Sequence, residues 1–121
     1  MLTQEQKDML HKAIELAQKP GMCNYLIDGE PCCVIGQLGM LNSISIEDMR
    51  KWSGITVDDL YFSKNTNRNF QQLWDIDMIL LVKLQKMWDH RDSSMIEFKN
   101  ETELRKNMHE VVDNYIGYPY N

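Results

Sequence analysis

No apolar run in this sequence is long enough to cross a membrane. The longest, MILLV at positions 78–82, has five residues, whereas a spanning helix needs about 20. The N-terminal stretch is polar from Thr3 to Asp8, so we expect neither a signal peptide nor a membrane anchor. There are only three cysteines, an odd number with no secretory context. We therefore expect reduced thiols and a cytoplasmic protein.

The sequence also lacks the short motifs that mark common enzymes. It contains no P-loop, dinucleotide-binding, zinc-protease or nucleophile-elbow pattern. The acidic pairs Asp58–Asp59 and Asp75/Asp77 stand where helices are expected to begin, which gives them a structural explanation. We therefore predict no catalytic residue and no cofactor.

Basic side chains are too few and too dispersed for a nucleic-acid surface. Lys and Arg number 13 against 18 Asp and Glu, which gives a net charge of −5. Nucleic-acid-binding domains typically gather their basic residues into a patch, so we do not expect nucleic acid as a partner. A contiguous acidic run, which would indicate a DNA mimic, is also missing.

What is present fits one globular domain over positions 1–121. Apolar residues make up 43% and charged residues 26%, a normal composition for a folded domain. Four expected helix starts carry a side chain that can accept a hydrogen bond from a backbone amide. They are Thr3, which forms a capping box with Gln6, and Ser45, Thr56 and Asn100. Pro20–Gly21 ends the first helix.

The segment 22–42 predicts a strand followed by a helix. Asp28–Gly29 is a hairpin turn signal after the strand Cys23–Ile27. The helix is expected from about Cys32 to Asn42, with Gly36 and Gly39 permitting close backbone packing. An alternative begins this helix at Pro31, whose fixed φ suits the first helical position.

A helix at about 69–89 is apolar on nearly all sides, which indicates a buried central element. We expect Trp74 and Trp88 to lie buried on one of its faces. Residues 95–98 favour a short edge strand. The predicted fold is thus mainly α (α+β): four to five helices surround this central helix, with a short β-hairpin or strand near 22–35.

The cysteines offer the only candidate metal or nucleophile site. Cys23, Cys32 and Cys33 with one histidine could bind zinc, but zinc ligands usually follow C-x₂₋₄-C spacing, and adjacent cysteines diverge in direction. A nucleophilic cysteine needs a nearby base, whereas His11 and His109 fall at polar or boundary positions of helices. We therefore predict no metal site and interpret the cysteines as core packing.

The polar stretch SKNTNRN, residues 63–69, is the candidate partner surface. It has two cations and no apolar residue, and aromatic side chains immediately precede it. The residues predicted to contact a partner are Tyr61, Phe62, Lys64, Asn65, Asn67 and Arg68.

Residues 22–90 resemble a set of small bacteriophage proteins without an assigned activity. Their pattern runs Cys-Cys-Leu-Gly-Val-Leu, Trp-Leu-Gly-Leu, Leu-Asn-Asp and Ser-Phe-x-x-Ile-Ala. The matching residues are Cys32, Cys33, Gly36 and Leu38, with one residue inserted, then Trp52, Gly54 and Ile55, then Asn69, Phe70 and Leu73. The chain departs from the pattern at FSKN, residues 62–65, where the pattern has Leu-Asn-Asp. The resemblance implies a phage origin.

Three functions follow. The first is a phage or mobile-element accessory protein in the host cytoplasm that binds a host protein, for example to inhibit a defence or regulatory component. A second copy of the chain remains a further possible partner. The second is a small-ligand or nucleotide-binding module that uses a pocket near GEPCCVIG, residues 29–36, and the loop 63–69. In this module Lys64, Arg68 and the amides at the start of the long helix hold an anion. The third, ranked last, is an enzyme that uses Cys33 or a carboxylate.

Overall fold

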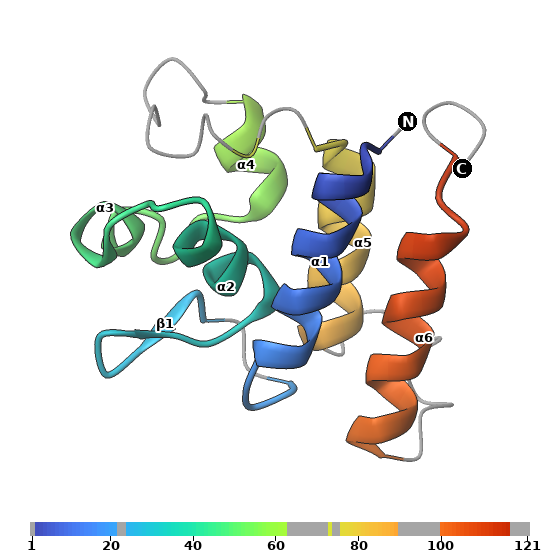
Figure 1. The fold of residues 1–121 in the computed structure, drawn as a ribbon. Helices are drawn as coiled ribbons and strands as arrows, with labels where there is room; N and C mark the ends of the chain where they lie inside the picture. Colours follow the sequence, from blue (N-terminus) through green and yellow to red (C-terminus); the bar gives the residue numbers. More distant parts are fainter. Residues whose placement is uncertain (1, 22–23, 63–72, 74–75, 90–99, 117–121) are drawn as a thin grey trace.

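The computed structural model describes residues 2–21, 24–62, 73, 76–89 and 100–116, and within them the protein is mainly helical with one small antiparallel sheet. Figure 1 shows the elements in chain order. They are α1 (Gln4–Leu16), β1 (Leu26–Ile27), β2 (Glu30–Pro31), α2 (Val34–Leu41), α3 (Ile46–Arg50), α4 (Val57–Phe62), α5 (Met78–Asp89) and α6 (Glu101–Asp113). The predicted fold class is confirmed. The described residues form six helices, the central α5 and five others, which agrees with the four to five expected around it; two of the five, α3 and α4, are very short.

The helix starts expected from local sequence are confirmed. Thr3 and Gln6 form the capping box of α1. The hydroxyl of Ser45 accepts a hydrogen bond from the amide of Asp48, and the side chain of Asn100 accepts one from the amide of Glu103. Such caps depend only on residues three positions apart, which is why the sequence reveals them.

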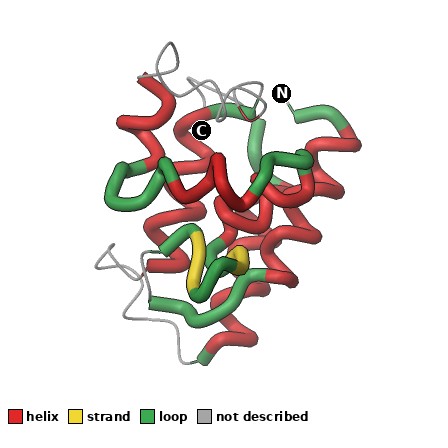
Figure 2. Tube along the Cα trace, turned by 90° about the vertical axis from the view of Figure 1, so that its left-hand side faces the viewer, coloured by secondary structure: helices red, strands yellow, loops and turns green. Residues whose placement is uncertain are grey.

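The expected hairpin is also present, on the near face of the molecule in Figure 2. Leu26 pairs with Pro31 and Ile27 with Glu30. Both turn residues have a positive φ, +54° at Asp28 and +79° at Gly29, as in the tight turns that favour Asp-Gly. Pro31 belongs to β2, so the alternative that begins a helix there is wrong, and α2 begins at Val34.

Helix α2 packs unusually close to the hairpin and to α3 because it contains two glycines. A Cβ atom on Gly36 would lie 2.1 Å from the backbone oxygen of Tyr25. A Cβ on Gly39 would lie 2.5 Å from the sulfur of Met49. The expectation that these glycines permit close packing is confirmed.

The predicted central helix is buried but shorter than expected. Helix α5 begins at Met78, not near residue 69, because the carboxylate of Asp77 accepts a hydrogen bond from the amide of Ile79 at 2.8 Å and so caps the helix. Leu73 and Ile76 are buried but lie outside α5. Trp88 is fully buried, as expected. The expectations for Trp74 and for residues 95–98 concern positions outside the described residues.

The backbone just after α1 is hydrogen-bonded to two distant segments of the chain. The amide of Gln18 donates to the carbonyl oxygen of Cys32 at 2.7 Å, and the Gln18 carbonyl accepts hydrogen bonds from the Cys32 thiol and the Trp88 indole. The amide of Gly21 donates to the carbonyl oxygen of Trp88 at 2.7 Å. These bonds hold the end of α1 against the start of α2 and the end of α5.

None of the helices in the described part of the chain has the length and apolar character needed to cross a bilayer. Helix α1 packs against α2 and α6, and α5 packs against α2, α4 and α6. Buried apolar side chains from all of these helices form the core.

Candidate functional site

Two of the six residues predicted to contact a partner lie at the end of α4. Phe62 is the most exposed large hydrophobic side chain among the described residues, with 74% of its surface accessible. Tyr61 packs partly against the core, and the two rings meet edge to face with centroids 6.3 Å apart. Lys64, Asn65, Asn67 and Arg68 lie outside the described residues.

The acidic pair at the start of α4 has the structural explanation proposed from the sequence. Asp58 and Asp59 occupy the first turn of the helix, where the positive end of the helix dipole favours carboxylates. The Thr56 hydroxyl accepts a hydrogen bond from the amide of Asp59. Hydrogen bonding to the Thr56 side chain also lowers the pKa of Asp58.

The adjacent cysteines are both buried. Cys33 is the N-cap of α2 and belongs to the apolar core, and burial raises the pKa of its thiol to about 12. Burial likewise raises the pKa of Cys32, whose thiol donates a hydrogen bond to the carbonyl of Gln18 at 3.3 Å. A raised pKa suppresses the reactive thiolate. Cys23 lies outside the described residues.

His11 and His109, which were considered as a base for a nucleophilic cysteine, contact each other instead. Nδ1 of His11 lies 2.7 Å from Nδ1 of His109, which joins α1 to α6. The outer nitrogen of His11 contacts Asp113 at 2.8 Å, and that of His109 contacts Glu15 at 3.0 Å. The four side chains therefore contact one another in the order Glu15, His109, His11, Asp113. No group of three potential metal ligands converges on one point among the described residues.

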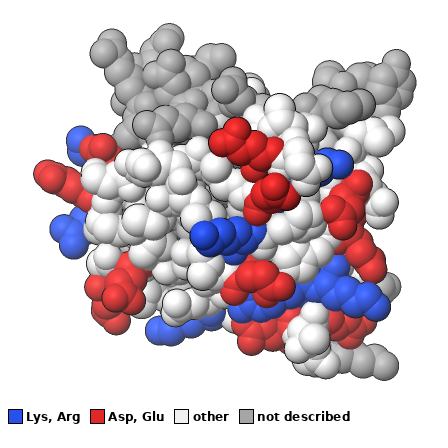
Figure 3. Space-filling model, in the orientation of Figure 1, with Lys and Arg blue, Asp and Glu red and all other residues white. Residues whose placement is uncertain are grey.

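A shallow groove runs beside this row of side chains. It has a volume of about 490 Å³ and is lined by Glu15, Thr102, Arg105, Lys106, His109, Glu110 and Asp113. Side chains of both charges stand close together in this region, over α6 and its border with α1 (Figure 3). The two signs are interleaved, so the groove has no single-sign field to attract a ligand.

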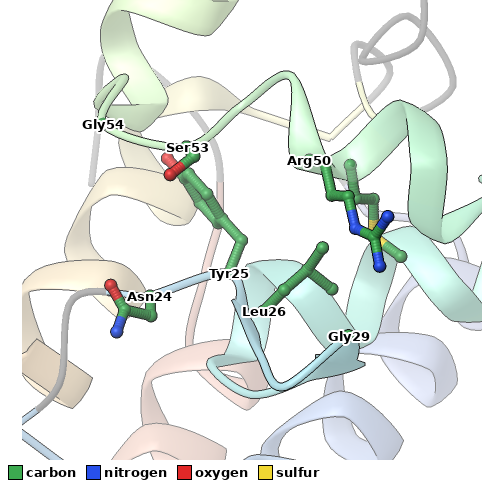
Figure 4. Close-up of a pocket in the computed structure, with 8 residues that line it drawn as sticks. Asn24, Tyr25, Leu26, Gly29, Arg50, Ser53 and Gly54 are labelled. Atoms are coloured by element: carbon green, nitrogen blue, oxygen red, sulfur yellow. The ribbon is translucent and has the colours of Figure 1, made fainter.

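A more enclosed pocket lies where the hairpin meets α3, shown in Figure 4. Its volume is about 290 Å³. The residues that line it are Asn24, Tyr25, Leu26 and Gly29 from the hairpin region, Met49 and Arg50 from α3, and Ser53 and Gly54 from the following turn. The pocket combines a guanidinium, a hydroxyl and an amide with apolar side chains, the composition typical of small-molecule sites.

The wall formed by Tyr25 is fixed from two sides. Its hydroxyl donates a hydrogen bond to the carbonyl oxygen of Ile55 at 2.6 Å. Its ring meets the buried ring of Trp52 edge to face, with centroids 5.8 Å apart. These two contacts fix the orientation of the Tyr25 side chain that lines the pocket.

The sequence indicated the neighbourhood of this pocket but not its residues. It suggested a pocket near residues 29–36 with Lys64 and Arg68 as anion ligands, whereas the structure places Arg50 beside Gly29. Arg50 is about twenty positions from the hairpin in sequence, and no motif links the two. The local signals were the Asp28–Gly29 turn and the two glycines of α2: Gly36 lets α2 approach Tyr25, and Gly39 lets it approach Met49 of α3.

No protein-family model matches the chain, and no curated protein or solved structure matches it. The resemblance to bacteriophage proteins therefore stays a prediction from the sequence. Six of the residues that carry it are buried: Cys32, Cys33, Gly36, Leu38, Trp52 and Leu73. Packing is a sufficient reason for these residues at these positions.

Proposed function

We propose that this protein is an accessory protein of a phage or mobile element that acts in the host cytoplasm by binding a host protein. A defence or regulatory component is the kind of target that fits such a protein. The observation that carries the proposal is the exposure of Phe62, at 74%, at the end of a helix. The resemblance to bacteriophage proteins suggests the origin.

Phe62 is suited to serve as an anchor because its helix is held in place. Val57 and Leu60 on α4 are buried, and α4 packs against α5. Covering a Phe side chain at an interface contributes about 1.5–3 kcal/mol. Little of that gain is lost to ordering when the side chain starts from a packed helix. Tyr61, whose ring contacts Phe62, adds to the apolar area.

The test is capture of a host protein that depends on Phe62. The tagged protein is incubated with host lysate, and the bound proteins are compared between wild type, Phe62→Ser and Met40→Ser. Met40 is a matched control because it is also an exposed large hydrophobic, at 42%, on a different helix. We expect a protein retained by wild type and Met40→Ser but lost with Phe62→Ser. Equal capture by all three would contradict the proposal.

The positive charges that follow α4 in the sequence predict an acidic partner. The variant Lys64→Glu with Arg68→Glu reverses both cations of residues 63–69. We expect it to lose the captured protein while its melting temperature stays close to that of wild type. Unchanged affinity in this variant would remove these cations from the binding surface.

A second candidate function is binding of a small ligand, which the pocket at the hairpin favours. Its volume of about 290 Å³ is at the lower end of the range for ligand sites. Saturable binding of small molecules at this pocket, in the absence of any host protein, would support this candidate.

A further inference from the structure

We propose that the pocket between the hairpin and α3 binds a compact ligand with one anionic group, a carboxylate or a phosphate, attached to an apolar body. This inference rests on the second candidate function, small-ligand binding. It adds the charge and shape of the ligand and the residue that recognises it, Arg50.

Arg50 supplies an uncommitted positive charge at one side of the pocket. It is the last residue of α3, it is exposed, and it forms no ion pair with any residue in the described part of the chain. Its neighbour Lys51 instead pairs with Asp48 at 3.6 Å, and Arg105 pairs with Glu101 at 2.5 Å. A guanidinium presents two parallel N–H donors that match a carboxylate or phosphate.

The guanidinium lies over the hairpin turn. A Cβ atom on Gly29 would come within 3.4 Å of Nη2 of Arg50. Absence of a side chain at Gly29 therefore leaves room beside the donors for the ligand's anionic group. The lining contains no Asp or Glu, so Arg50 is the only charged group that lines this pocket among the described residues.

The remaining walls suit an apolar body with a polar edge. Leu26 lies between Arg50 on one side and Tyr25 and Ser53 on the other (Figure 4). Met49, also in the lining, is almost fully buried and adds a polarisable thioether. Ser53 lines the pocket on the side away from Arg50 and carries a hydroxyl, a group that can hydrogen-bond a ligand (Figure 4). The small volume and the single cation limit the ligand to one anionic group on a compact ring or branched chain.

The test uses three aromatic probes of similar size: benzoate, phenyl phosphate and neutral benzamide. Each is titrated into the ¹⁵N-labelled protein, and the amide signals of Leu26, Gly29, Ser53 and Gly54 are followed. A ligand this small is expected to bind with a Kd on the order of 1 mM. We expect saturable shifts at these amides with one or both anions, and at least tenfold weaker binding of benzamide. The stronger anion tells whether the ligand class is carboxylate or phosphate.

Three variants test whether Arg50 recognises the anion and whether the probes occupy this pocket. Arg50→Gln should weaken anion binding at least tenfold, whereas Lys51→Gln, which removes the same charge one position away, should leave the Kd within twofold. Ser53→Leu should block all three probes by filling the pocket. Anion binding that is unchanged in Arg50→Gln, or benzamide binding as tight as that of the stronger anion, overturns the inference but leaves ligand binding standing. No saturable shift with any probe overturns both the inference and the second candidate function.

Discussion

Arg105 on α6 caps the C-terminus of α1, donating a hydrogen bond to the carbonyl oxygen of Ala17 at 2.7 Å. The same guanidinium donates to the carbonyls of Ile14 and Glu15 and lies over the ring of Trp88, 4.9 Å from its centroid. The last turn of α1 has no basic residue of its own. Arg105 therefore provides, from a distant part of the chain, the positive charge and the donors that a helix C-terminus needs.

Arg105→Ala should be among the most destabilising changes at a partly accessible position. It leaves carbonyl groups at the end of α1 without their donors and removes a cation–π contact, which together should cost about 2–3 kcal/mol of unfolding free energy. Arg105→Lys should recover only part of this, because one ammonium cannot reach the same set of oxygens. Urea unfolding measures both. Lys106→Ala, at the exposed next position, should change stability little, and full stability in Arg105→Lys would contradict this role.

Gly36→Ala should destabilise the protein although alanine is the better helix former. The propensity gain of about 1 kcal/mol is smaller than the cost of moving a backbone carbonyl, since the new Cβ would lie 2.1 Å from the Tyr25 oxygen. We expect a net loss of at least about 2 kcal/mol. Gly39→Ala should lose less, because its nearest neighbour is the end of a flexible Met49 side chain. Urea unfolding of the two variants gives the comparison, and equal stabilities would show that α2 can shift away from the hairpin.

His11 and His109 should stabilise the contact between α1 and α6 as a pair. A hydrogen bond between their Nδ1 atoms requires a hydrogen on one of the two and none on the other. A double-mutant cycle with His11→Ala and His109→Ala should give a coupling energy of about 0.5–1.5 kcal/mol. The control cycle combines His11→Ala with Glu110→Ala, at the neighbour of His109 in sequence. It should give a coupling energy near zero. A coupling near zero for the histidine pair would mean that the two rings do not interact in solution.

Cys33 should make the stability fall at alkaline pH. Burial raises the pKa of its thiol from the ordinary 9.0 to about 12, so between these values the folded protein retains a proton that the unfolded chain has lost. The contribution is therefore complete below pH 9 and is lost as pH rises toward 12, by up to about 1.4 kcal/mol per pH unit. The stability difference between wild type and Cys33→Ala, measured by urea unfolding at pH 8 and pH 10.5, should shrink accordingly.

The same burial should protect both described thiols from reagents. In a Cys23→Ser background, Cys32 and Cys33 should react with a thiol reagent at pH 8 only at the rate at which the protein opens, and at once when it is unfolded. Rapid labelling of the folded protein would contradict the packing role. If the cysteines only pack, Cys32→Ala with Cys33→Ala should also leave partner binding intact at temperatures where this variant is folded.

The features that the sequence predicts are those set by residues a few positions apart. The caps at Thr3, Ser45 and Asn100 and the turn at Asp28–Gly29 depend only on local chemistry. The start of α5 was misplaced because the apolar pattern extends past Asp77, whereas the capping hydrogen bond to Ile79 decides where the helix begins.

Contacts between distant positions gave no comparable signal. His11 and His109 are 98 positions apart and each is ordinary on its own helix. Arg50 lies in the last turn of the short helix α3. A basic residue at this position is already explained by its interaction with the helix dipole, so the sequence offers no reason to assign it to a pocket. The pocket residues come together through contacts among the hairpin, α2 and α3 that no local pattern reveals, so neither the pocket nor its cation could be assigned from sequence.

The carbonyl of Gln18 has a consequence for how the molecule folds. It accepts hydrogen bonds from residues 14 and 70 positions further along the chain. Such a corner cannot close until α5 has docked, and contacts of this separation slow folding because the intervening chain must first be ordered. It should likewise open only when most of the molecule opens. The amides of Gln18 and Gly21, although they lie just past a helix end where fraying is usual, should exchange their hydrogens with solvent as slowly as the core of α5.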